Sequence, residues 1–147
     1  MTPTDPSTYD FTKQIGFLLR RAYQRHVAIF QQAVPESRLT AAQFVVLLTA
    51  RDKGPCEISS IVAMTSIDEP SVRGIVERLK WRELLRTEHE PGDARHMLVH
   101  LTPAGQELLA QTVPFAQQIT QQTYGDLSPD ERATLVRLLN KMQGTSA

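Results

Sequence analysis

The spacing of apolar residues changes just past the middle of the chain, and this change limits the folds that the chain can adopt. Residues 57–64 and 68–82 have apolar side chains at helical spacing. Residues 84–89 and 96–101 are instead typical of two short strands, and the turn-forming residues 90–95 join them as a hairpin tip. Two short helices joined by a tight turn and followed by a hairpin predict a helix-turn-helix unit with a β-hairpin wing.

Longer helical patterns flank this unit on both sides. Three of the flanking helices have typical capping residues at their expected starts, namely Thr40, Thr102 and Ser128. Pro114 lies inside the long pattern after the hairpin and is expected to kink it, because its ring clashes with the preceding turn. We therefore expect one mainly helical α+β domain over 1–147, with a winged helix-turn-helix lobe at 40–101 and dimerisation helices at 9–35 and 102–144.

The overall charge gives no support to nucleic-acid binding. Sixteen basic and sixteen acidic residues give a formal net charge of zero. A local excess exists over residues 71–86, where five Lys or Arg side chains stand against two carboxylates. A second basic row lies opposite the apolar side of the first helix and is expected to be a solvated face; it consists of Lys13, Arg20, Arg21 and Arg25.

Several classes of protein are excluded by what the sequence lacks. The single cysteine, Cys56, rules out an internal disulfide. No apolar run reaches the roughly 18 residues of a membrane span, and the first ten residues do not resemble a signal peptide, so we expect a cytoplasmic protein without a membrane partner. Motifs for nucleophiles, phosphate loops and metalloproteases are also missing, so we expect neither an enzyme nor a cofactor.

The second helix of a helix-turn-helix pair inserts its first residues into the major groove of DNA. This rule assigns residues 68–82 as the DNA-reading helix. The outward-facing residues near its start are Glu69, Pro70, Ser71, Arg73 and Gly74. We expect Arg73 to bind guanine through two hydrogen bonds, and Ser71 can reach a base or a phosphate. Contacts to phosphate are expected further along the helix, from Arg78, Lys80 and Arg82.

The hairpin tip offers a second DNA contact. Arg95 can enter an adjacent minor groove, where a narrow A·T tract concentrates negative potential. Asp93 stands two residues before it and could orient its guanidinium. The alternative is an ordinary ion pair on the protein surface, which would contribute little to stability.

Five short motifs carry a resemblance to a known family: Pro70-Ser71-Val72-Arg73, Ile75-Val76-Glu77-Arg78-Leu79, Leu84-Leu85-Arg86, Asp93-Ala94-Arg95 and Leu101-Thr102-Pro103-Ala104-Gly105. The segment 59–105 that contains them resembles MarR-family regulators, and the helix order extends the resemblance over nearly the whole chain. The resemblance implies a homodimer held by the first, fifth and sixth helices, which binds a pseudo-palindromic operator in double-stranded DNA and usually represses a nearby gene. It also implies that Arg95 enters the minor groove and that Ser71 and Arg73 contact the major groove.

Two positions depart from the family pattern. Glu83 follows the reading helix where family members commonly have glycine, so the turn into the hairpin is expected to be built differently. Ala94 replaces a frequent second arginine in the wing, which leaves Arg95 to act alone.

The resemblance implies release from DNA by a small aromatic acid or phenolic compound, bound between the dimerisation helices and the DNA-binding lobe. Arg20, Tyr23 and His26 are three residues apart along the first helix and share one face. An arginine can pair with a carboxylate, and the two rings can hold an aromatic ligand. The alternative is that both rings pack at an interface and that Arg20 is solvated.

Three other readings stay open. A redox-responsive regulator would need a reactive thiol, and Cys56 is expected at the start of the third helix, where a helix N-terminus lowers a thiol pKa, although a structural role is favoured. A metal-responsive regulator could use His89, His96 and His100, but no carboxylate cluster accompanies them. A winged helix used as a protein-interaction module would present an acidic or apolar reading helix, whereas this one presents arginines.

Overall fold

The structure is a computed structural model that describes residues 5–34 and 39–144, without the side chains of Ala94 and Arg95. Within these residues the helices are α1 (Ile15–Ala33), α2 (Ala41–Lys53), α3 (Ile58–Thr65), α4 (Glu69–Trp81), α5 (Pro103–Tyr124) and α6 (Pro129–Met142). The strands are β1 (Cys56–Glu57), β2 (Leu85–Glu90) and β3 (Asp93–Leu101), and two short 3-10 helices, η1 (Pro6–Thr8) and η2 (Phe11–Lys13), precede α1.

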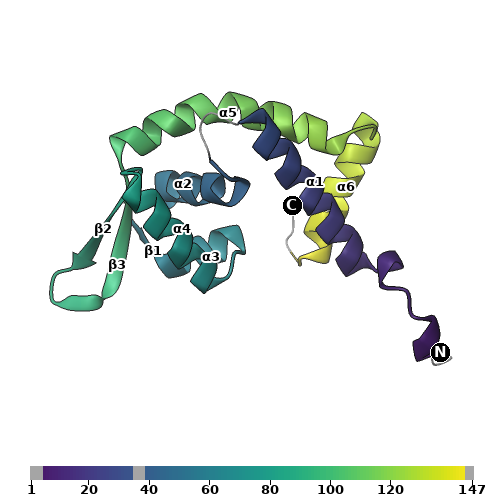
Figure 1. The fold of residues 1–147 in the computed structure, drawn as a ribbon, viewed down its shortest axis with the longest axis horizontal. Helices are drawn as coiled ribbons and strands as arrows, with labels where there is room; N and C mark the ends of the chain where they lie inside the picture. The colour runs from purple at the N-terminus through teal and green to yellow at the C-terminus, as the bar shows by residue number, and fades with distance from the viewer. Residues whose placement is uncertain (1–4, 35–38, 145–147) are drawn as a thin grey trace.

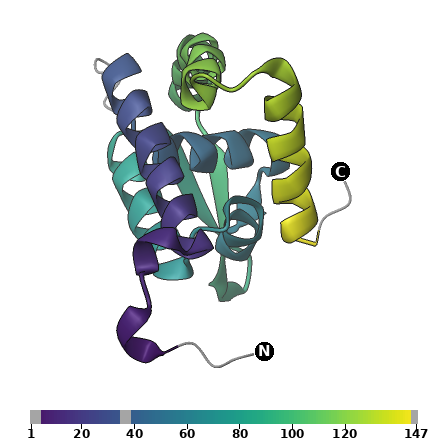
Figure 2. The same cartoon turned by 90° about the vertical axis from the view of Figure 1, so that its right-hand side faces the viewer.

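The elements form two groups that α5 connects (Figure 1). One group, the DNA-binding lobe, consists of α2, α3, α4 and a three-stranded antiparallel sheet with the order β1-β3-β2. The other group, the outer helices, consists of α1, which packs against α5, and α6. Figure 2 shows α1 and α6 standing apart on opposite sides of the molecule below α5, while η1 projects away from it. This arrangement confirms the expected winged helix-turn-helix with additional helices.

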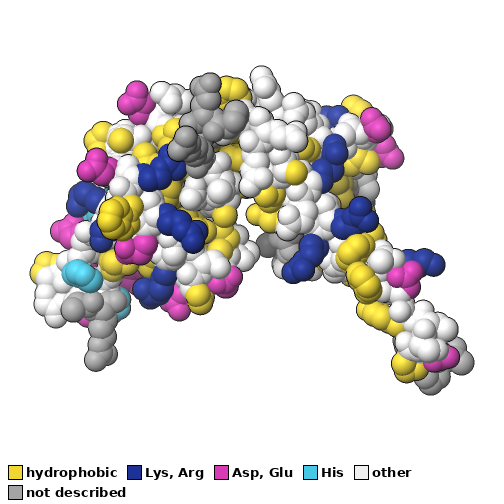
Figure 3. Space-filling view, in the orientation of Figure 1, with side chains coloured by type: hydrophobic (Ala, Val, Ile, Leu, Met, Phe, Trp, Pro, Cys, Tyr) yellow, Lys and Arg dark blue, Asp and Glu magenta, His cyan; other side chains and the backbone are white. Residues whose placement is uncertain are grey.

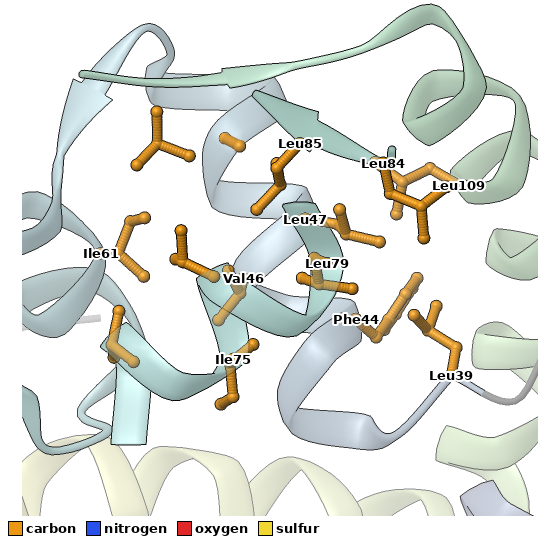
Figure 4. Packing of buried hydrophobic residues seen from close by; sticks show 14 of the residues in the cluster. Leu39, Phe44, Val46, Leu47, Ile61, Ile75, Leu79, Leu84, Leu85 and Leu109 are labelled. Atoms are coloured by element: carbon orange, nitrogen blue, oxygen red, sulfur yellow. The ribbon is translucent and has the colours of Figure 1, made fainter. Parts of the chain in front are cut away.

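The core lies in the DNA-binding lobe. Figure 4 shows side chains from α2, α3, α4, β2 and α5 meeting in one cluster, with Val46, Leu47 and Leu79 near its centre. Side chains of this size each stabilise the fold by roughly 1.5–3 kcal/mol when fully buried. All four apolar residues that the sequence places on the inner face of the reading helix are buried: Val72, Ile75, Val76 and Leu79.

Two local predictions were wrong in α2 and α3. The helical spacing after Thr40 predicts an apolar stripe on α2 that includes Val45, but Val45 is 37% exposed and the neighbouring Val46 is fully buried. The third helix was expected to begin at Glu57, but Glu57 pairs with Leu98 and Cys56 pairs with Val99, so both belong to β1. A two-residue strand has no periodicity, and only the partner strand reveals it.

The capping predictions are confirmed. Thr40 and Ser128 each form a capping box with the side chain three residues later, and Thr102 accepts a hydrogen bond from the Gly105 amide. α1 begins later than expected, at Ile15, because Asp10 caps the separate turn η2. α5 continues through Pro114 and curves along its length (Figure 1). No described helix is both long and apolar enough to cross a membrane.

The turn from α4 into β2 explains how glutamate replaces the expected glycine. Glu83 adopts the left-handed conformation, with φ 61°, that glycine adopts most easily. The Leu84 amide donates to the Leu79 carbonyl, and the Glu83 amide donates to the Lys80 carbonyl, as in a Schellman motif. The prediction of a different turn is therefore wrong: the backbone keeps the glycine-type conformation, and a residue with a Cβ adopts it.

Candidate nucleic-acid interface

The start of α4 is fixed by a compact cap. The Asp68 carboxylate accepts hydrogen bonds from the amide and from the hydroxyl of Ser71, both at 2.9 Å. These two bonds hold the pKa of Asp68 below its ordinary value. Pro70 is tolerated because the first turn of a helix leaves its amides unpaired. Ser71 was predicted to contact DNA; since its hydroxyl donates to Asp68, it can act toward DNA only as an acceptor.

Arg73 is exposed on α4 and paired within the helix. Its Nη2 lies 3.3 Å from Oε1 of Glu69, one turn earlier, and both side chains are 57% exposed. An exposed pair of this kind contributes little to stability. Glu69 therefore holds the guanidinium of Arg73 near the start of the helix. Arg73 can leave Glu69 to bind guanine or phosphate with little loss of free energy.

The remaining residues predicted on α4 are exposed or half-buried. Gly74 is half-buried, and a Cβ added there would meet nothing within 4 Å, so the space beside it is open. Arg78, Lys80 and Arg82 are exposed. Figure 3 shows Lys and Arg side chains gathered on the visible face of the lobe.

The wing has a tighter turn than the sequence predicts. The tip was expected to span 90–95, but Glu90 pairs with Asp93, so only residues 91–92 form the turn and β3 begins at Asp93. Asp93 was predicted to orient Arg95, and its carboxylate contacts the ring nitrogen Nδ1 of His96. The contact with His96 was missed, because spacing alone does not show which side chains a bulged strand brings together. The predictions for the side chains of Ala94 and Arg95 lie outside the described part of the chain.

A second group of charged side chains lies at the base of the wing. Arg86 Nη1 lies 3.6 Å from Glu88, and His100 Nε2 lies 3.0 Å from the same carboxylate. Among the described residues, no three His, Cys, Asp or Glu side chains are arranged to hold a metal ion. The geometry gives the metal-responsive reading no support.

The candidate effector residues on α1 are not equivalent. Arg20 and Tyr23 are exposed, whereas His26 is half-buried and its Nδ1 lies 2.9 Å from the hydroxyl of Thr123 on α5. The rings of Tyr23 and His26 are 6.2 Å apart between centroids. The structure thus brings Tyr23 and His26 together and gives His26 a partner on another helix.

Arg25 was expected to lie in a solvated row, and it is exposed, but it also has backbone partners on another helix that the sequence does not show. Its guanidinium donates to the carbonyls of Gln122 at 2.8 Å and Thr123 at 3.4 Å. Both carbonyls lie at the C-terminal end of α5, where backbone acceptors lack helical partners. Arg25 therefore ties α1 to the end of α5, next to the contact made by His26.

Cys56 does not lie at a helix N-terminus. It is buried in β1, and burial raises the pKa of its thiol above the ordinary value. A raised pKa lowers the fraction of reactive thiolate. The redox-responsive reading therefore has no support in this residue.

The outer helices and η2 carry large apolar side chains that are exposed to solvent. On η2 and α1 they include Phe11, Ile15, Leu18, Leu19 and Tyr23, and on α6 they include Leu135, Val136, Leu138 and Met142. None of the residues of α6, all of which are described, is buried. Continuous exposed apolar surface is typical of association sites.

A comparison of the sequence with models of protein families gives one match. The model described as MarR family matches residues 39–97, which contain α2, α3, α4 and most of the wing. The HTH-type transcriptional repressor NicR of Pseudomonas putida is 46% identical over 140 residues, which cover 95% of this chain and 89% of NicR.

Two solved structures have a fold similar to that of this chain. BpsR of Bordetella bronchiseptica, whose DNA binding is regulated by 6-hydroxynicotinic acid, is 55% identical with a TM-score of 0.87, covering 93% of this chain and 98% of that chain. A mutant of Escherichia coli MarR in complex with operator DNA is 27% identical with a TM-score of 0.82, covering 92% of this chain and 99% of that chain.

Proposed function

Because this chain belongs to the MarR family and is a transcriptional repressor of the MarR type, we propose that a small aromatic acid releases it from its operator. Regulators of this family bind operator DNA as dimers, and they are not enzymes. The observation that carries the proposal is the similarity to BpsR, since 6-hydroxynicotinic acid regulates the DNA binding of that protein. The cytoplasm, where operator DNA is found, is the proposed location.

The exposed basic side chains of α4 support the proposed major-groove contacts, and the resemblance to MarR-family regulators supports the contact proposed for Arg95. Arg73 leaves Glu69 and forms two hydrogen bonds with guanine in the major groove. Arg78, Lys80 and Arg82 neutralise phosphates, and Arg95 enters the flanking minor groove. A homodimer places its two α4 helices in successive major grooves about 34–36 Å apart, which requires a pseudo-palindromic operator.

Arg73→Ala tests the major-groove contact, with Arg78→Ala as the matched control on the same helix. We expect Arg73→Ala to weaken operator binding by about 1–3 kcal/mol and to leave binding to unrelated DNA nearly unchanged. Arg78→Ala is expected to weaken both and to lower the salt dependence. Fluorescence anisotropy with both DNAs measures this; equal operator affinity for Arg73→Ala and the wild type would contradict the assignment.

The proposed effector site is the α1 face that carries Arg20, Tyr23 and His26. Arg20 is placed to pair with a carboxylate, and Tyr23 offers an exposed ring for stacking. A ligand that recruits the His26 ring would compete with Thr123 and loosen the joint between α1 and α5. α5 leads directly into the DNA-binding lobe, so a change at this joint alters the spacing of the two α4 helices.

An anisotropy titration of the preformed operator complex tests effector release. We expect 6-hydroxynicotinic acid to dissociate the complex and nicotinic acid, which lacks the hydroxyl group, to act more weakly. Arg20→Ala is expected to bind operator normally but to need more 6-hydroxynicotinic acid for release. Failure of 6-hydroxynicotinic acid, 4-hydroxybenzoic acid and salicylic acid to release the wild-type protein would overturn the proposed function.

A further inference from the structure

The wing contains an irregularity that the contacts proposed above do not explain. β2 and β3 pair regularly as far as His89 opposite Met97. The next pair is Glu90 opposite Asp93, so β2 advances by one residue while β3 advances by four. β3 therefore bulges over residues 94–96. Bulges of this kind re-aim side chains at functional sites.

One side-chain contact joins the two ends of this bulge. Nδ1 of His96 contacts Oδ2 of Asp93, and the two side chains are 48% and 39% exposed. Residues three apart point to opposite faces of a regular strand, so the bulge is what allows this contact. Arg95, the proposed minor-groove residue, stands between the two in the sequence. The ends of the segment that carries Arg95 are thus held together by His96.

Among the described side chains, the other charged groups that act on His96 are acidic. They are Glu57 on β1 and Glu90 at the end of β2. The hydrogen bond to Asp93, reinforced by these carboxylates, raises the pKa of His96 above its ordinary value, while burial opposes the rise only weakly. The ring therefore favours the imidazolium form more than a free histidine does.

We propose that His96 is a positioning residue of the wing, whose imidazolium binds Asp93, closes the bulge and sets Arg95 for the minor groove, so that operator affinity rises as pH falls. This inference rests on the proposed role of Arg95. The proposal predicts a repressor whose affinity for operator DNA depends on pH as well as on an effector.

The direction of the pH effect follows from the charge on the ring. The imidazolium is present below the raised pKa and is lost as pH rises through it. Its loss replaces an ion pair by a neutral hydrogen bond and removes one positive charge near the DNA phosphates. We expect the operator affinity to fall about three- to fivefold between about pH 6 and pH 8.5, the range of a modest surface ion pair.

Two glutamine variants of the full-length dimer test the proposal. His96→Gln keeps a hydrogen-bonding side chain but cannot titrate, and His89→Gln is the matched control on β2, outside the Asp93 contact. Operator affinity is measured by anisotropy from pH 6 to 8.5 at constant ionic strength, after thermal melting has shown that both variants fold. We expect the wild type and His89→Gln to show the same loss of affinity as pH rises, and His96→Gln to lose most of the dependence. A pH dependence in His96→Gln equal to that of the wild type would overturn the proposal.

An NMR titration of the His96 ring in the free protein gives a second readout. We expect Asp93→Asn to lower the pKa of His96, because the carboxylate is the main cause of the raised value. An unchanged His96 titration in Asp93→Asn would overturn the contact, and Arg95→Ala with wild-type operator affinity would overturn the link to DNA. Absence of effector release would overturn the proposed function alone and leave the His96 result intact.

Discussion

The DNA-binding lobe and the outer helices have similar apolar patterns but bury them very differently. In the lobe, Leu47, Ile61 and Leu79 are fully buried. In the outer helices, Ile15 of α1 is 59% exposed and Leu138 of α6 is 46% exposed. Figure 3 shows the gap between the two groups on the visible face, with apolar side chains along the outer part of the molecule.

This difference separates two kinds of stability within one chain. The lobe finds its packing partners within the same chain, in its own elements and in α5, so its folding is expected to be independent of protein concentration. Regulators of this family bind DNA as dimers, so we expect the exposed apolar surface of the outer helices to pack against a second copy. Their contribution to stability is then linked to association. Matched substitutions in the two regions test this distinction.

Leu79→Ala is expected to have the largest effect. It leaves a cavity beneath α4 at a fully buried position, which costs about 2–5 kcal/mol of unfolding free energy. Chemical denaturation followed by circular dichroism measures the loss, which should be the same at low and high protein concentration. A loss that disappears at high concentration would mean that the lobe also depends on the dimer.

Leu138→Ala is the matched change in the outer helices. In the isolated chain its side chain is partly exposed and its removal would cost little. In a dimer that covers α6, we expect a loss of about 1–2 kcal/mol per subunit, seen as a shift of the melting temperature that grows on dilution. Sedimentation velocity should show weaker association. A stability and an association equal to those of the wild type would place α6 outside the interface.

Glu83→Gly is expected to stabilise the lobe by about 1 kcal/mol. Glu83 has a positive φ, and a left-handed residue with a Cβ costs roughly 1–2 kcal/mol. Ser66→Gly, at the left-handed end of α3, is the matched change, and we expect a similar gain. Thermal melting measures both gains. A loss of stability in Glu83→Gly would show that its side chain contributes more than the backbone strain costs.

The range of the interactions along the chain explains which features the sequence could predict. Local signals were enough for the caps at Thr40, Thr102 and Ser128 and for the buried face of α4, because each depends on residues within one or two turns. They were not enough for β1, whose two residues become a strand only through Val99 and Leu98.

The candidate site shows the same limit. The positions on α4 follow from its period, but the pairing of Arg73 with Glu69 and of Asp93 with His96 depends on side-chain geometry. The partners of Arg25 were missed for the same reason, since the carbonyls that it binds lie 97 and 98 residues further along the chain. The charge run correctly predicts that Arg25 is exposed, but it does not show that the end of another helix lies beside it.

Gly74→Ala has the smallest expected effect on stability and separates folding from DNA binding within the lobe. The added methyl group meets nothing within 4 Å, and alanine in a helix interior is favoured over glycine by about 0.5–1 kcal/mol. We therefore expect a slightly higher melting temperature for the free protein. We also expect weaker operator binding, because the methyl group occupies the open space beside α4 where the edge of the major groove is expected to lie. Gly16→Ala on α1, where the added methyl group also has open space, is the control away from DNA. If Gly74→Ala binds the operator as tightly as Gly16→Ala does, the DNA does not approach this point of the helix, and α4 must enter the groove through a different face.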